Sequence, residues 1–110
     1  DAIVFAMANP IPEIMPGEAL KAGAAIVSSG RSDFPNQINN ALAFPGIFLA
    51  VIKGRLTKVT QEMKDAASNT LADLVKNPTP ANIIPDMFYP KLAQHLARAI
   101  LKVKINTKYG

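Results

Sequence analysis

The sequence contains no cysteine and no tryptophan, and only 6% of its 110 residues are aromatic. The missing cysteines exclude disulfide scaffolds, thiolate metal sites and cysteine nucleophiles, and they are compatible with the cytoplasmic localisation that we expect. The few aromatic residues exclude a large stacking platform for nucleotide bases. The longest apolar runs are far shorter than the roughly 20 residues that a membrane span needs, so we expect no membrane insertion.

Charged residues are also scarce, at 18%, whereas 49% of the residues are hydrophobic. This apolar content is enough for a packed core, and the length fits one small domain or part of a larger one. The chain begins on an apolar run without a basic segment, so we expect no signal peptide. The net charge of +4 includes a lysine tail, Lys102, Lys104 and Lys108, that is not interleaved with aromatic residues. We therefore expect no nucleic-acid binding.

The first third of the sequence predicts a strand, a helix and a second strand. Residues 2–8 form an apolar run without alternation, which is typical of a parallel strand that helices cover on both faces. Pro10 ends that strand, and a short helix is expected to follow, with Pro16 near its first turn and Gly23 as its left-handed stop. Residues 24–27 predict the second strand. This order indicates a compact βαβ unit and an α/β fold.

The remaining sequence predicts helices joined by turn-rich loops. Residues 36–53 are helical in pattern, with a kink or a break expected at Pro45. Another helix is predicted after Thr60, a fair N-cap, and it runs up to the proline-rich loop of residues 77–85. A last helix is expected over residues 90–103, whose apolar members share one face.

Polar residues follow both predicted strands, where ligands bind in an open parallel α/β sheet. Asn9 closes the first strand and the loop of residues 28–33 closes the second, while Asn39 and Asn40 lie near the start of the next helix. A carboxamide donates and accepts hydrogen bonds without adding charge, so it suits a carboxylate, a hydroxyl or a nicotinamide amide. The alternative is that these asparagines only cap and turn the backbone.

Other kinds of chemistry lack the residues that they need. His95 is the only histidine, so neither a nucleophilic triad nor a histidine metal site can be built from it alone. The acidic residues show no ligand-type clustering, and the glycines form neither a G-x-G-x-x-G nor a P-loop. Asp33 beside Arg31 predicts a local ion pair that shapes its loop. We therefore expect no catalytic and no metal-ligating residue in this segment.

Two segments resemble signatures of malic enzymes. Residues 5–16, F-A-M-A-N-P-I-P-E-I-M-P, resemble the family's F-A-x-A-N-P-x-P-E-I-x-P segment. Residues 29–48, S-G-R-S-D-F-P-N-Q-I-N-N-A-L-A-F-P-G-I-F, look like the bacterial and archaeal form of its second signature. The resemblance implies that residues 1–110 are the C-terminal portion of an NAD(P)-binding domain. It implies a partial Rossmann-like, doubly wound parallel sheet followed by C-terminal helices.

The family oxidises L-malate with NAD or NADP and decarboxylates the oxaloacetate to pyruvate and carbon dioxide, with Mg or Mn as a Lewis acid. The resemblance implies that Asn9 contacts the substrate and the nicotinamide end of the cofactor. It implies that Asn40 hydrogen-bonds the malate carboxylate and also binds the cofactor, and that Asn39 binds on the cofactor side. The family's catalytic tyrosine and lysine, its metal ligands and its dinucleotide fingerprint precede this region. Residues outside this segment would therefore bind the metal, and the isolated segment is predicted to be inactive.

The resemblance also bears on partners. It implies L-malate and pyruvate as ligands, the remainder of a malic enzyme chain as a partner, and a homo-oligomer, typically a dimer. An alternative is a non-catalytic binding or assembly module that kept the fold and lost the chemistry. A third reading is a related amino-acid dehydrogenase domain, against which the paired asparagines in Gln37-Ile38-Asn39-Asn40-Ala41 argue.

Overall fold

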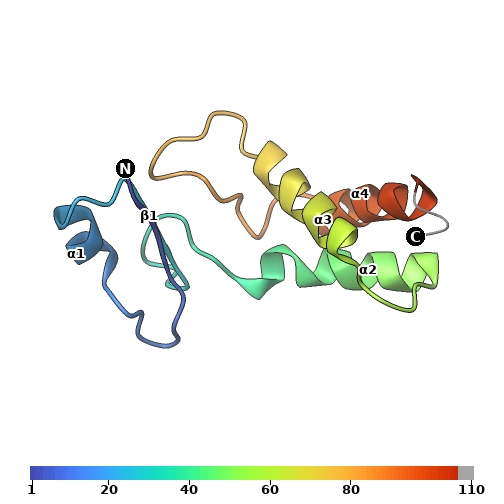
Figure 1. Cartoon of the computed structure of the whole chain (residues 1–110), viewed down its shortest axis with the longest axis horizontal. Helices are drawn as coiled ribbons and strands as arrows, with labels where there is room; N and C mark the ends of the chain where they lie inside the picture. The colour runs from blue at the N-terminus through green and yellow to red at the C-terminus, as the bar shows by residue number, and fades with distance from the viewer. Residues whose placement is uncertain (107–110) are drawn as a thin grey trace. The chain divides into compact units, whose positions relative to one another are not determined.

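The computed structural model describes residues 1–106, and Lys108 of the lysine tail lies outside them. The chain divides into two compact units (Figure 1). Of the described residues, the first unit comprises residues 1–39 and 75–84, and the second comprises residues 40–74 and 85–106. The elements, in chain order, are β1 (Ile3–Ala6), α1 (Pro16–Lys21), β2 (Ile26–Ser29), the 3₁₀ turn η1 (Asn40–Leu42), α2 (Phe44–Gly54), α3 (Gln61–Asp73) and α4 (Leu92–Asn106).

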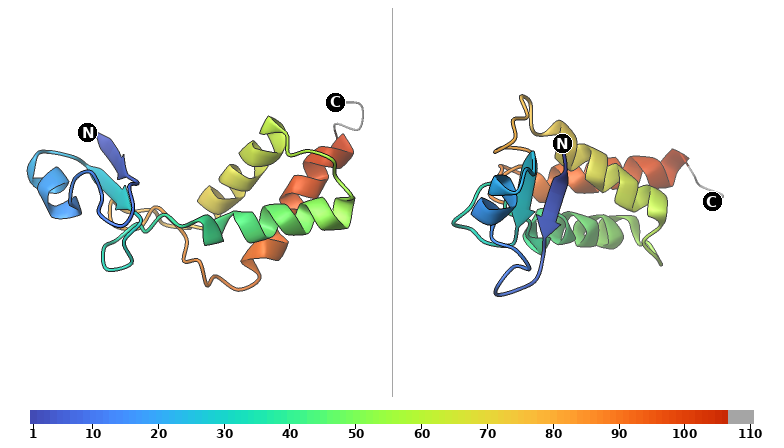
Figure 2. Two further views of the ribbon diagram at one scale, coloured as in Figure 1. Left: turned by 90° about the horizontal axis from the view of Figure 1, so that it is seen from below. Right: turned by 60° about the vertical axis from the view of Figure 1, so that its left-hand side comes forward.

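The first unit is built on two parallel strands that α1 connects (Figure 2). The register pairs Ile3 with Ile26 and Ala6 with Ser29. Pro16 lies in the first turn of α1, where a backbone N–H would have no acceptor within the helix, so a proline is tolerated there. Gly23 follows α1 with the predicted positive φ, 108°. The βαβ unit and the α/β class predicted from the sequence are confirmed.

The two strands differ from their predictions in extent and in burial. β2 begins at Ile26, because the amide of Ala24 still bonds back to the Ala19 carbonyl of α1 at 3.1 Å. The expectation that the first strand is buried on both faces is not met within residues 1–106. Ala6 is buried, but Ile3 and Phe5 are 61% and 46% exposed. Because side chains alternate along a strand, the described residues cover one face of β1 and leave the other open.

In the second unit, α4 packs against both α2 and α3 (Figure 2). The buried apolar side chains of this unit are Leu42, Ala50, Met63, Ala67, Leu92, Leu96, Ala97 and Ile100. Thr60 caps α3 as predicted, since its hydroxyl accepts a hydrogen bond from the Met63 amide at 3.2 Å. None of the helices within residues 1–106 combines the length and the apolar character that crossing a membrane requires.

The prediction of a helix over residues 36–53 with an interruption at Pro45 was wrong about where the helix begins. Residues 36–39 are not helical, and α2 begins at Phe44 with Pro45 in its first turn. A proline is tolerated there because the first amides of a helix have no intrahelical acceptor. The proline therefore starts α2 instead of kinking a longer helix. The last helix begins at Leu92, two residues later than predicted.

Gly46 lets α2 and α4 approach closely. A methyl carbon built on Gly46 would lie 2.5 Å from Cβ of Leu96 and 3.2 Å from the Ala93 carbonyl oxygen. Both distances are shorter than a carbon tolerates without movement of its neighbours. The absence of a side chain at this position is therefore part of the packing between the two helices.

We predict that Gly46→Ala destabilises the protein by about 1–3 kcal/mol, because the added methyl group overpacks the contact between α2 and α4. Urea denaturation of the purified protein measures this change. Gly17→Ala is the matched control, since a methyl group there would meet nothing within 4 Å. If both variants unfolded at the same urea concentration as the unmodified protein, the close approach would be contradicted.

Candidate functional site at the strand ends

The parallel pairing places the carboxyl ends of β1 and β2 at one edge of the first unit. Ala6 pairs with Ser29 in the last rung, and the two chains then continue into the segments that carry Asn9 and Gly30. A methyl carbon built on Gly30 would lie only 2.8 Å from Oδ1 of Asn9. The structure therefore brings Asn9 against the loop after β2. The missing side chain of Gly30 leaves room for the Asn9 carboxamide.

Glu13 closes the loop in which Asn9 lies. The backbone amide of Ala8 donates a hydrogen bond to Oε1 of Glu13 at 3.1 Å. This hydrogen bond is the main cause that holds the pKa of the Glu13 carboxyl below its ordinary value of 4.5. The sequence pattern did not reveal this role, because Glu13 was one of several scattered acidic residues. A carboxylate a few residues after a strand end could have indicated this role, because the backbone amides there have no partner in the sheet and need another acceptor.

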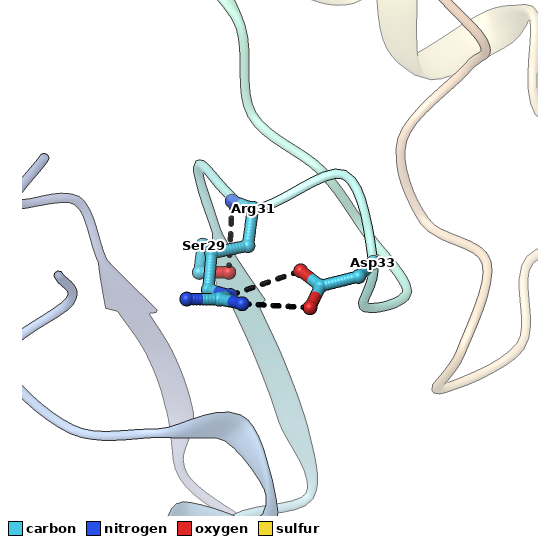
Figure 3. A network of polar contacts seen from close by, with 3 residues as sticks. All are labelled: Ser29, Arg31 and Asp33. Carbon is cyan, nitrogen blue, oxygen red and sulfur yellow. Dashed lines mark hydrogen bonds and ion pairs between the residues drawn. The ribbon is translucent and has the colours of Figure 1, made fainter. Parts of the chain in front are cut away.

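The loop after β2 is shaped by the predicted ion pair (Figure 3). Nε and Nη2 of Arg31 donate to the two carboxylate oxygens of Asp33 at 2.9 and 2.7 Å. The hydrogen bond from Arg31 lowers the pKa of Asp33, and the same bond raises the pKa of Arg31. The amide of Arg31 also donates to Oγ of Ser29 at 3.3 Å. These contacts tie the turn to the end of β2.

The segment before Asn39 runs beside the end of β2. The amide of Ile38 donates to the Ser29 carbonyl at 2.8 Å, and Nε2 of Gln37 donates to the Gly30 carbonyl at 3.4 Å. Asn39 is half-buried and belongs to the first unit, whereas Asn40 is exposed and begins the 3₁₀ turn of the second unit. The first unit thus holds Asn9, the loop after β2 and Asn39, and Asn40 follows as the next residue.

The donor set at the strand ends fits some ligands and not others. The carboxamide of Asn9 can pair with the amide of a nicotinamide or with a carboxylate. Within residues 1–106 no group of three or more histidine, aspartate or glutamate side chains could hold a metal ion. His95 lies on α4, with its ring edge-on to Tyr89 at a centroid distance of 5.9 Å.

The first unit also contains an apolar cavity of about 170 Å³. Its walls come from α1, β2 and the segments around Pro35 and Pro80. The asparagines at positions 9, 39 and 40 are not among its lining residues. The polar groups at the strand ends therefore form a surface separate from this cavity.

Known proteins resemble this chain over nearly its whole length. A family model described as the NAD-binding domain of malic enzyme matches residues 1–105. A bifunctional malic/malolactic enzyme from Bacillus subtilis is 49% identical over 109 residues, and an NAD-dependent malic enzyme from Geobacillus stearothermophilus is 42% identical over 109 residues. Each alignment covers 97% of this chain. Other relatives are named NADP-dependent malic enzymes.

A solved structure supports the same likeness. The crystal structure of malic enzyme from Pyrococcus horikoshii matches with a TM-score of 0.91 and 49% identity, over 96% of this chain. The chain spans only about a quarter of the length of the proteins that it matches: 27% and 23% of the two curated relatives, and 24% of the solved chain.

We predict that Glu13→Gln lowers the melting temperature at pH 7, because the neutral amide is a weaker acceptor for the Ala8 amide. The pKa of Glu13 is lower in the folded protein than in the unfolded protein. Its hydrogen bond therefore stabilises the fold fully above the pKa of the unfolded state, and this stabilisation is lost as the pH falls through the pKa of the folded state. The difference between the two proteins should therefore shrink below about pH 4. Asp73→Asn, at an exposed carboxylate on α3, is the control. A difference that is independent of pH would contradict this assignment.

Proposed function

The chain belongs to the malic enzyme family, and we propose that the enzyme containing it oxidises L-malate with NAD or NADP and decarboxylates the product to pyruvate and carbon dioxide. The match of residues 1–105 to the NAD-binding domain of malic enzyme carries this proposal. The carboxamides at the strand ends support it, because they suit a hydroxy acid and a nicotinamide.

We place residues 1–110 in the C-terminal portion of the NAD(P)-binding domain, with the remainder of the enzyme chain as their partner. The exposed side of α2 supports this placement. Phe44, Phe48 and Ile52 follow one another at helical spacing and are 48%, 60% and 74% exposed. A helix that is apolar on all sides is normally covered on all sides. We expect the complete enzyme to be a cytoplasmic homo-oligomer, typically a dimer.

The proposed roles of the asparagines rest on the resemblance to malic enzymes, and the chemistry of a carboxamide is compatible with them. Asn40 donates its amide hydrogens to a carboxylate of malate, and Asn9 pairs with the nicotinamide carboxamide and with the substrate. Asn39 lies on the cofactor side. When bound, NAD or NADP would supply the hydride acceptor, and Mg or Mn would be bound by residues outside this segment. The contribution of this segment is orientation, because neutral carboxamides fix both reactants without taking up or releasing a proton.

We predict that Asn40→Ala lowers kcat/KM for malate by about 10- to 150-fold, because a hydrogen bond to a charged group contributes about 1.5–3 kcal/mol. Steady-state kinetics of the complete enzyme, with malate, NAD or NADP and a divalent metal, measure it. Asn40→Asp should be worse, since its carboxylate repels the carboxylate of malate. Asn69→Ala, at an exposed position of α3, is the control.

Two outcomes would contradict the proposal. If the unmodified enzyme does not reduce NAD or NADP in the presence of malate and Mg or Mn, the proposed activity is wrong. If the enzyme is active but Asn40→Ala has the kinetics of Asn69→Ala, the activity stands and the role of Asn40 is wrong.

We predict that Gly30→Ala impairs the site through Asn9. The added methyl group would lie 2.8 Å from Oδ1 of Asn9 and must displace that carboxamide, which is the movable end of a side chain. The Michaelis constants for malate and cofactor should rise by about tenfold, which corresponds to one misplaced hydrogen-bonding group.

A double-mutant cycle identifies the route of this effect. Once Asn9→Ala has removed the carboxamide, Gly30→Ala should cause no further loss, so the two effects should be strongly non-additive. Additive losses would mean that Gly30 acts independently of Asn9.

A further inference from the structure

Asn36 is a buried polar residue in the first unit, and its side chain joins three segments of that unit. Only 7% of its surface is exposed. Its Nδ2 donates to the carbonyl of Val27 at 3.3 Å and to the carbonyl of Pro80 at 2.8 Å. Its Oδ1 accepts from the amide of Ile83 at 2.8 Å. The two donor hydrogens and the acceptor oxygen of one carboxamide are therefore all in use.

The partners of Asn36 are far apart in the sequence. Val27 lies in β2, whereas Pro80 and Ile83 come 44 and 47 residues after Asn36. The later segment is a tight turn, in which Thr79 and Asn82 exchange backbone hydrogen bonds at 3.2 and 2.8 Å. The side chain of Asn36 therefore attaches this turn to the strand that carries the loop of the site.

The backbone of Asn36 also leads directly into the predicted site. Its φ is 60°, a left-handed conformation that asparagine tolerates better than most residues. Asn39 follows after three residues, a span of at most about 11 Å. Along this span Ile38 bonds to Ser29, as described above. A displacement of Asn36 therefore acts on the segment that leads to Asn39.

We propose that Asn36 is a positioning residue for the Asn39 carboxamide, and this inference rests on the function proposed above. The Asn36 side chain fixes the start of the segment that carries Asn39, from one side through β2 and from the other through the turn at Thr79–Asn82. The site requires an amide here. An aspartate has the same shape and could still accept from Ile83, but as a carboxylate it cannot donate to the carbonyls of Val27 and Pro80.

The test is a double-mutant cycle in the complete enzyme with Asn36→Asp and Asn39→Ala. Asn36→Asp should lower kcat/KM for NAD or NADP by about 10- to 100-fold, mainly through KM, because a misplaced carboxamide loses contact with the cofactor. In the Asn39→Ala background the same substitution should cost much less, since its target is already absent. Asn69→Asp makes the same chemical change on the exposed surface of α3 and should leave the kinetics unchanged.

Equal losses in both backgrounds, or unchanged kinetics of Asn36→Asp, would overturn the positioning role while malate oxidation stands. An unmodified enzyme without malate activity would instead overturn the proposed function, and this inference with it.

A measurement on the unmodified enzyme covers the case in which Asn36→Asp does not fold. Coupling between two sites is reciprocal, so a cofactor bound at Asn39 should stabilise the three hydrogen bonds of the Asn36 side chain. Hydrogen exchange at the Ile83 amide, which donates to Asn36, should therefore slow when malate and cofactor are added. An exchange rate at Ile83 that does not change, while malate and cofactor are bound, would overturn the inference.

Discussion

The parallel pairing of β1 with β2 is the constraint on which the first unit depends. Antiparallel strands would place the segments after them at opposite ends of the pair, whereas parallel strands place both at one edge. The last rung joins Ala6 to Ser29, and the polar segments of both strands begin just beyond it. Gly30 and Asn9 can then meet at a distance that leaves no room for a side chain on Gly30. The direction of the strands therefore determines where the candidate site lies, and the individual polar contacts act within that arrangement.

Features set by neighbouring residues could be predicted from the sequence. The place of Pro16 in the first turn of α1, the cap of Thr60 and the ion pair of Arg31 with Asp33 each depend on residues within a few positions of one another. The place of Pro45 could not be read in the same way, because a proline breaks a helix or begins one according to where the helix starts. The open face of β1 was missed for a different reason. An apolar run shows that a strand can be covered on both faces, but the residues that cover it must come from elsewhere in the chain.

Asn36 and Glu13 show the limit of local patterns within the candidate site. Asparagines are common in turns, so position 36 looks like an ordinary turn residue between Pro35 and Gln37. Its importance comes from a carbonyl and an amide more than forty residues later, and no local pattern encodes such a contact. Glu13 is closer to its partner, five residues from Ala8, but it is exposed and resembles any solvated carboxylate. Sequence reasoning therefore placed Asn9, Asn39 and Asn40 at strand ends and helix starts, but it did not find the residues that hold those segments.

Under the function proposed above, this segment and the remainder of the enzyme have different tasks. The described residues offer carboxamides at the strand ends, and these groups keep the same charge throughout a reaction. In that proposal they orient the reactants and take up or release no proton. Orientation alone can supply a large part of a rate enhancement, provided that the reacting groups are held in place. The contacts that hold the flanking loops are the hydrogen bonds of Asn36, the bond from the Ala8 amide to Glu13 and the pair of Arg31 with Asp33. We therefore propose positioning as the task of this segment, and acid–base and metal chemistry as the task of the larger part of the enzyme that the segment does not span.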